Sequence, residues 1–185
     1  MTRTMSRSLL IVGALALAAC SAEPQAMPAK PPKPEAPAPR TDGLLVAPGA
    51  IGPATTTTPF DVIALKRLFP GADVRAGTVS EEGIDMPVIF VTGPGDLKIE
   101  FYGDAGTLDR AYITGAAARG PRDETIGLRM SASGFGPGDC IEGAERFGDA
   151  TICRRPGAPQ LGYTFGSIRA ADPVLQGFSW TADAS

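Results

Sequence analysis

The amino-acid sequence predicts an α+β fold in which two tandem β-α-β-β-β units form an antiparallel sheet with two short helices. Three observations favour this class. A helix-start signal follows a short apolar run near residue 58, several segments that alternate between apolar and polar residues come after it, and the same order of signals recurs in the second half. The predicted repeat-like halves cover about residues 44–115 and 124–182, although two unrelated α+β halves are an alternative.

The first unit opens with a strand at Leu44–Ile51, followed by a helix. Thr58 is the expected N-cap, Pro59 suits the first helical position, and Asp61 faces the unpaired amides of the first turn. Pro70-Gly71 ends this helix. Its predicted apolar stripe contains Phe60, Ile63, Ala64 and Leu68.

An antiparallel meander follows the first helix. Strands are expected at Asp73–Val79 and Met86–Thr92, on either side of a turn at Glu81-Glu82-Gly83. The next strand shows the clearest period of two, because Leu97, Ile99 and Phe101 alternate with Lys98, Glu100 and Tyr102. A turn at Gly103–Gly106 then leads to a strand at Thr107–Thr114.

The second unit repeats this order. We expect a short strand at Thr125–Leu128, then a helix at Met130–Phe135 with Ser131 or Ser133 as its cap. Gly134 and Gly136 disfavour that helix, so its extent through Gly134–Gly138 stays open. Further strands are predicted around Cys140-Ile141 and at Thr151–Cys153, Leu161–Phe165 and Gly177–Trp180.

The N-terminus has the pattern of a bacterial export signal, predicted to be residues 1–19. Arg3 and Arg7 precede a short apolar run, Leu9–Ala19, that is about half of the roughly 20 residues needed to span a bilayer. Leu17-Ala18-Ala19-Cys20 resembles a lipobox, which makes Cys20 the predicted lipidation site and the first mature residue. The alternative is an ordinary secretory signal with a chance cysteine.

Residues 20–40 are predicted to be a lipid-anchored cysteine and a Pro-rich linker, ahead of a single periplasmic domain at 41–185. Seven prolines in Ser21–Arg40 favour extended polyproline II. Ser21, rather than Asp, after the cysteine favours the outer membrane, with the domain facing the periplasm. Without Arg3 and Arg7 the mature chain has 15 Lys plus Arg against 20 Asp plus Glu, and this net charge of −5 argues against a nucleic-acid partner.

Histidine is absent from the chain, which excludes Ser-His-Asp and Cys-His catalysis and removes the commonest zinc ligand. We therefore predict no catalytic residue, metal or cofactor. A low-ranked alternative is a hydrolase that uses a pair of carboxylates such as Glu100 and Asp104. The acidic hairpin tip at Glu81, Glu82 and Asp85 is expected to be a solvated turn rather than a calcium site, and Gly134–Gly138 to be a turn rather than a phosphate loop.

Cys140 and Cys153 are the two cysteines that remain once Cys20 is acylated, and in an oxidising compartment they are expected to form a disulfide. The alternatives are a two-cysteine metal site, for which the chain has no histidine, and a redox pair, whose usual Cys-x-x-Cys spacing is absent. The two cysteines are expected in adjacent antiparallel strands, where the disulfide would fix the register of the pair. Arg154-Arg155 is expected at a solvated hairpin edge. The strand aromatics are expected to pack in the core or on a sheet face, and an exposed aromatic cluster would indicate a binding surface: Tyr102, Tyr112, Tyr163, Phe165, Phe178 and Trp180.

Several of these segments together resemble the RpoE-regulated lipoprotein family. The resemblance lies in Gly49–Pro53, Thr58-Pro59-Phe60, the turn Gly103–Thr107, Ile126-Gly127, and the pair Cys140 and Cys153 followed by Gly162–Phe165. It implies an envelope-stress-linked lipoprotein with a domain of unknown function, and it supplies no catalytic residues. This chain differs in its longer Pro-rich linker and its glycine-rich Gly134–Gly138.

The sequence thus predicts a membrane-anchored, non-enzymatic periplasmic lipoprotein that binds a protein or an envelope component. The membrane is the first expected partner, through lipid on Cys20, and a periplasmic protein is the second. The main alternative is an inhibitor-like domain that presents a concave sheet to a periplasmic enzyme. Carriage of a small molecule or lipid would require an apolar cavity.

Overall fold

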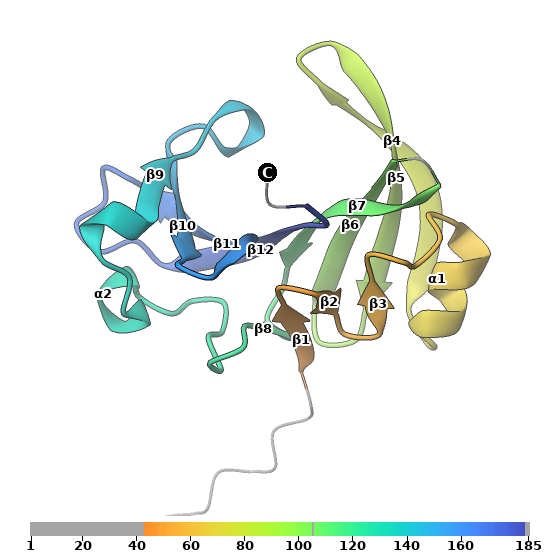
Figure 1. The fold of residues 1–185 in the computed structure, drawn as a ribbon, viewed down its shortest axis with the longest axis horizontal. Helices are drawn as coiled ribbons and strands as arrows, with labels where there is room; N and C mark the ends of the chain where they lie inside the picture. The colour runs from red at the N-terminus through yellow and green to blue at the C-terminus, as the bar shows by residue number, and fades with distance from the viewer. Residues whose placement is uncertain (1–42, 105, 184–185) are drawn as a thin grey trace, which may run out of the picture. The chain divides into compact units, whose positions relative to one another are not determined.

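Eight strands, each antiparallel to its neighbours, form the large sheet of the molecule (Figure 1). The computed structural model describes residues 43–104 and 106–183. The strand order is β4-β5-β6-β7-β12-β11-β10-β9, so that two meanders of sequential strands meet where β7 pairs with β12. The strands are β4 (Asp73–Glu81), β5 (Ile84–Gly93), β6 (Leu97–Asp104), β7 (Thr107–Thr114), β9 (Cys140–Glu142), β10 (Ala150–Arg155), β11 (Ala158–Ser167) and β12 (Leu175–Thr181).

A second, smaller sheet has the order β3-β2-β1-β8. Its strands are short: β1 (Leu44–Ala47), β2 (Ala50–Ile51), β3 (Ala54–Thr55) and β8 (Ala118–Arg119). β1 is antiparallel to β2 and parallel to β8. The indole nitrogen of Trp180 on β12 donates a hydrogen bond of 2.9 Å to the carbonyl oxygen of Pro48, which ties the β1–β2 turn to the large sheet.

The predicted α+β class is wrong, because the fold is mostly β, with 54% strand and 11% helix. The helices are α1 (Val62–Leu68), α2 (Met130–Ser133) and the 3₁₀ turns η1 (Pro137–Asp139) and η2 (Glu145–Phe147). The predicted β-α-β-β-β units also fail at their first strands. β1 belongs to the small sheet, and Thr125–Leu128 forms only an isolated bridge between Thr125 and Arg119. Gly127 explains part of this, since its φ of 91° departs from extended geometry.

The first helix begins later than predicted. Asp61 is its N-cap, because Oδ1 of Asp61 accepts hydrogen bonds from the amides of Ile63 and Ala64 at 2.9 Å each. The hydroxyl of Thr58 instead accepts a hydrogen bond from the amide of Thr55. The buried face also differs from the predicted stripe, because Leu65 is fully buried while Ile63, a member of that stripe, is 60% exposed.

The second helix is a single turn of four residues rather than six. Gly134 ends it in the left-handed conformation, with φ of 74°. Neither predicted serine caps it. The amide and hydroxyl of Ser131 both donate to the carboxylate of Asp172, and the hydroxyl of Ser133 donates to the carbonyl oxygen of Met130 at 2.6 Å.

One face of the large sheet, the core face, is apolar across all eight strands. A single register row shows this, with the disulfide at its end: Val74, Val91, Ile99, Ile113, Phe178, Tyr163, Cys153 and Cys140. Residues of the small sheet, α1 and the segment around α2 pack with this face. The predicted strands of both meanders are confirmed, as is the alternation that buries Leu97, Ile99 and Phe101.

The predicted disulfide between Cys140 and Cys153 is present. The two cysteines are register partners on β9 and β10, with their Cα atoms 4.0 Å apart. The bond therefore closes the base of the β9–β10 loop, which carries η2.

No helix within residues 43–104 and 106–183 combines the length and apolar character needed to cross a bilayer.

Candidate functional site

The opposite face of the large sheet, the open face, is polar and aromatic. Its central register row makes this plain: Arg75, Phe90, Glu100, Tyr112, Ser179, Gly162 and Arg154. The neighbouring row carries three threonines, one lysine and one aspartate: Asp73, Thr92, Lys98, Thr114, Gly177, Thr164 and Ile152. These side chains therefore lie on the face of the sheet that does not pack in the core.

The open face is curved, and Arg146 demonstrates the curvature. Arg146 lies on η2, beside β9 and β10, whereas Glu81 lies on β4 at the other end of the strand order. A flat sheet would separate its two edge strands by about 34 Å at the usual strand spacing. Nevertheless, Nη1 of Arg146 lies 3.1 Å from Oε1 of Glu81, so the sheet curls and the η2 loop folds over it.

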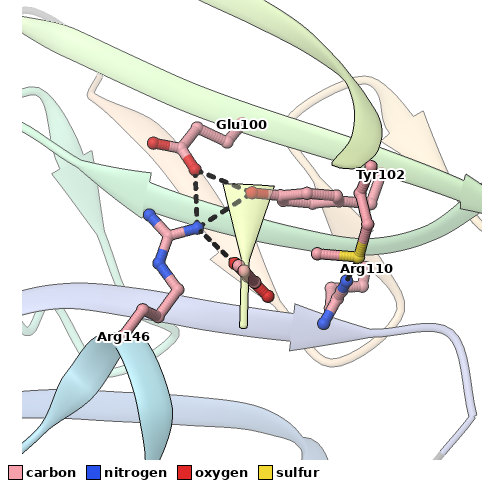
Figure 2. Close-up of polar contacts among 6 residues, drawn as sticks. Glu100, Tyr102, Arg110 and Arg146 are labelled. Atoms are coloured by element: carbon pink, nitrogen blue, oxygen red, sulfur yellow. Dashed lines mark hydrogen bonds and ion pairs between the residues drawn. The ribbon is translucent and has the colours of Figure 1, made fainter. Parts of the chain in front are cut away.

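Three acceptors from β4 and β6 surround Nη1 of Arg146, and Figure 2 shows Glu100 and Tyr102 among them. Nη1 lies 2.9 Å from Oε2 of Glu100 and 2.8 Å from the phenolic oxygen of Tyr102, in addition to its contact with Glu81. The hydroxyl of Tyr102 in turn donates to Oε2 of Glu100 at 3.0 Å. We call these four residues the Arg146 cluster.

Aromatic rings support the flat face of the same guanidinium. The carbon Cζ of Arg146 lies 4.5 Å from the ring centroid of Tyr112 and 5.7 Å from that of Phe147. Tyr112 also packs edge-on against Phe147, with centroids 5.0 Å apart. A second cation, Arg110, lies 4.6 Å from the ring of Tyr102. The position of Arg146 is thus fixed by both stacking and hydrogen bonding.

The charges of the cluster reinforce one another. Burial raises the pKa of Tyr102 to about 12, and the negative charge of Glu100 adds to that effect. Burial alone would lower the pKa of Arg146, but its hydrogen bond and charge interaction with Glu100 raise the pKa above its usual value. At neutral pH the arginine is therefore charged and the tyrosine is protonated.

A cavity of about 420 Å³ lies beside the cluster on the open face. Its volume falls within the range of small-molecule sites. Six strands and η2 line it, and its polar and aromatic lining residues include three cations and one carboxylate: Arg75, Lys98, Arg146, Glu100, Phe90, Tyr112, Phe147, Thr92, Thr114, Thr164 and Gln176. The arrangement can hold a ligand of a few rings and contact it with charges, hydroxyls and aromatic faces.

A second arginine cluster lies at the core face. Nη2 of Arg155 is 2.7 Å from Oε1 of Glu124, and their side chains are only 12% and 4% exposed. The same nitrogen donates to the carbonyl oxygen of Ser133 at 2.9 Å, and Cζ lies 4.2 Å from the ring centroid of Phe135. This pair fixes the segment between β8 and β9 against the sheet.

Of the residues singled out in the sequence, Glu100 and Glu81 belong to the Arg146 cluster, whereas Asp104 does not line the cavity. The expected solvated turn holds for Glu82 and Asp85 only, because the side chain of Glu81 is 10% exposed. The expected solvated position of Arg155 is wrong. Cys20 lies outside the described residues, and within those residues no group of three or more potential metal-ligating side chains occurs.

Most strand aromatics are core residues, as expected: Tyr163, Phe165, Phe178 and Trp180 are all at most 1% exposed. Tyr102 and Tyr112 lie on the open face of the sheet, which agrees with the expectation of core or sheet-face packing. Arg146 and Phe147 were not expected at a site. Their position in the loop closed by the disulfide is a signal that could have drawn attention to them.

The fold has a known counterpart. A crystal structure of the uncharacterized protein yfeY from Escherichia coli is similar, with a TM-score of 0.61 over 74% of this chain and 98% of that chain. The sequence identity is 19%, so the likeness concerns the fold alone. No protein-family model matches the chain. No curated protein matches it either.

Proposed function

We propose that this protein is a non-catalytic binding module, anchored in the bacterial outer membrane by lipid on Cys20, whose ligand occupies the open face. The observation that carries the proposal is the cavity of about 420 Å³ beside the Arg146 cluster. Core packing needs neither a curved polar face nor a half-exposed arginine held by three acceptors. Desolvating and ordering these polar side chains opposes folding, so their presence on this face favours a role in ligand binding.

The size of the cavity favours a small ligand over the inhibitor-like alternative. A stable protein partner buries about 800 Å² on each side. The η2 loop crosses the open face and leaves a cavity suited to a few rings. A concave face could hold either a small ligand or part of a periplasmic enzyme. A covalent adduct with a protein in a crosslinking experiment would favour the enzyme.

The carboxylate hydrolase is not favoured by the geometry. Glu100 and Asp104 are four residues apart on β6, which corresponds to about 13 Å at the usual rise of a strand. Paired carboxylates of glycosidases lie within about 5–9.5 Å of each other. Glu100 is moreover occupied by Arg146 and Tyr102.

Site-specific photo-crosslinking tests the binding face. p-Benzoylphenylalanine is placed at Thr114, an exposed residue of the cavity, and in a matched variant at Lys66, which is exposed on α1. After irradiation of intact cells, we expect adducts at position 114 that are absent at position 66. Equal adducts at both positions, or none at 114, would contradict a binding role for the open face.

Membrane fractionation tests the anchor. Cys20→Ser is expected to abolish acylation and release the protein from the membrane fraction, because two or three acyl chains hold a lipoprotein essentially permanently. Ser21→Asp keeps the cysteine and is expected to move the protein to the inner membrane. Unchanged fractionation of Cys20→Ser would overturn the proposed localisation.

The resemblance to RpoE-regulated lipoproteins adds a proposal about expression. On that resemblance, we expect transcription to rise when outer-membrane protein folding is disturbed. A transcript level that does not respond to such stress would count against this link and would leave the binding face untouched.

A further inference from the structure

We propose that the open-face cavity binds a carboxylate-bearing glycan, with Arg75 and Lys98 as the residues that recognise the carboxylate. This inference rests on the proposed function and names the ligand class of the same site. Three features of the cavity carry it: two cations with weak partners, polar side chains on a backbone that is already paired, and half-buried aromatic rings.

The first feature is charge. Of the three cations that line the cavity, Arg146 is neutralised by Glu100 and Glu81. Within residues 43–104 and 106–183, the ion-pair partner of Arg75 is Asp73, at 3.9 Å, and that of Lys98 is Asp96, at 3.2 Å. Arg75 also lies over the ring of Phe90, with Cζ 5.2 Å from its centroid.

Both of these pairs have side chains more than 60% exposed. Exposed pairs of this kind contribute little energy, so either cation can exchange its partner for an anionic ligand. Because neither aspartate lines the cavity, the lining carries excess positive charge, although the chain as a whole has a net charge of −3.

The second feature is the supply of hydrogen-bonding side chains. Thr92, Thr114, Thr164 and Gln176 line the cavity, and no hydrogen bond joins their side chains to another group in the described part of the chain. Their hydroxyl and amide groups can each donate and accept. A polyhydroxylated ligand offers many partners of both kinds.

The third feature is the aromatic surface. Phe90, Tyr112 and Phe147 are half-buried, and each contributes to the cavity wall. The negative face of an aromatic ring attracts positively polarised C–H groups. One face of Phe90 lies against Arg75, at 5.2 Å, and one face of Tyr112 lies against Arg146, at 4.5 Å. The C–H face of a pyranose ring would therefore pack against the apolar surface that these rings leave to the cavity wall.

The position of the cavity argues against a peptide as the ligand. The floor lies in the middle of the sheet, where the backbones of β5, β6, β7, β12 and β11 are paired with their neighbours. Extended peptides are commonly recognised through the free backbone of an edge strand. In this cavity the side chains, rather than free backbone groups, must contact the ligand. This arrangement favours a glycan over an extended peptide.

Two disaccharides of equal ring number test the proposal. N-acetylglucosaminyl-β-1,4-N-acetylmuramic acid carries a lactyl carboxylate, whereas di-N-acetylchitobiose lacks it. Isothermal titration of the full-length lipoprotein in neutral detergent micelles compares the two. We expect the acidic disaccharide to bind about tenfold more tightly at low salt, with the difference shrinking as salt screens the charges.

Variants assign the preference to residues. Arg75→Gln and Lys98→Gln are each expected to reduce the preference for the acid a few-fold, and the double variant is expected to bring the ratio of the two disaccharide affinities to about one. Lys66→Gln removes one exposed charge away from the cavity and is expected to change nothing. Circular dichroism and thermal melts confirm that each variant is folded.

Equal affinity for the two disaccharides, binding of neither, or tighter binding of an acidic tripeptide would overturn the proposal. The crosslinking experiment separates this failure from that of the proposed function. If position 114 gives adducts with a protein and no disaccharide binds, the open face remains a binding surface and the glycan is wrong. If position 114 gives no specific adduct, the proposed function fails as well.

Discussion

Arg146 and Arg155 have nearly the same chemical partners on opposite faces of one sheet. Each contacts a glutamate, each stacks on aromatic rings, and each lies close to a tyrosine. They differ in exposure, since the Arg155 side chain is 12% exposed and that of Arg146 29%. Because Arg155 and Glu124 are buried, their ion pair has a structural role. Arg146 remains accessible to solvent beside the cavity.

The residue types around an arginine alone therefore do not distinguish a structural ion pair from a binding site. Nη2 of Arg155 contacts both Glu124 and the carbonyl oxygen of Ser133, which closes the segment around α2 onto the core. Arg146 joins strands from both ends of the sheet and forms part of a cavity wall. If the two arginines have different roles, substitutions at their partners should differ in their effects on stability and on binding.

The largest effect is expected from Glu124→Gln. It leaves Arg155 as a buried charge without its partner, and such changes cost about 3–5 kcal/mol of unfolding free energy. The matched control is Asp123→Asn, which breaks an exposed pair with Arg119 at 3.2 Å and should cost less than about 1 kcal/mol. Urea denaturation at pH 7 measures both, and equal effects would contradict the structural role.

The same pair predicts a pH dependence. Burial alone would raise the pKa of Glu124, but the hydrogen bonds from Arg155 and from the amide of Arg122 lower it below its ordinary value. The stabilisation is therefore present above the ordinary pKa of a glutamate and is lost as the pH falls through the lowered, folded-state pKa. Denaturation between pH 7 and 3 should show a shallower acid loss in Glu124→Gln than in the wild type.

The next effect concerns the disulfide between Cys140 and Cys153, which are 13 residues apart. Replacing both by alanine should cost about 3 kcal/mol, since a loop of this length gains roughly that amount on closure. Because the bond closes the base of the loop that carries Arg146, we expect the ligand affinity of the double variant to fall even at temperatures where the variant is still folded. A double variant that melts lower and yet binds the acidic disaccharide unchanged would contradict this coupling.

A smaller effect is expected for Arg146→Met, which keeps much of the side-chain volume and removes the charge. Hydrogen bonds to charged groups contribute about 1.5–3 kcal/mol, and partial exposure reduces this to about 1–2 kcal/mol. Chemical denaturation gives the stability, and isothermal titration gives the affinity. A loss as large as that of Glu124→Gln would place Arg146 among the structural residues and remove the contrast.

The smallest change is spectroscopic. The pKa of Tyr102 is raised to about 12, so its phenol should ionise after an exposed tyrosine would. Absorbance at the phenolate band during alkaline titration should lose a late step in Tyr102→Phe. If the absorbance lost in the variant is instead that of an early step, near the pKa of an ordinary phenol, Tyr102 is not buried against Glu100.

Local patterns were sufficient to predict most strands. The alternation at Leu97, Ile99 and Phe101 and the turn at Glu82-Gly83, where both residues have positive φ, depend on neighbours in sequence. The helices were overestimated because capping residues such as Thr58 also make turns. The small sheet was missed, since its parallel pair joins Leu44 to Ala118 across 74 positions.

The candidate site was beyond local patterns for the same reason. Glu81, Glu100 and Arg146 meet only because the sheet curls, and no sequence spacing encodes the distance between its two edges. The position of Arg155 was predicted wrongly because two consecutive arginines after a strand are typical of a solvent-exposed hairpin edge. Its partner, Glu124, lies 31 residues away.

The order of the strands also has a consequence for the time course of folding. β4 to β7 pair only with sequence neighbours, and so do β9 to β12, until β7 meets β12 through partners such as Ile113 and Phe178. Short-range contacts close quickly, whereas a contact across 65 positions must first overcome the entropy of a long loop. The two meanders can thus form independently, and their docking along β7 and β12 is the step at which the curved face first exists.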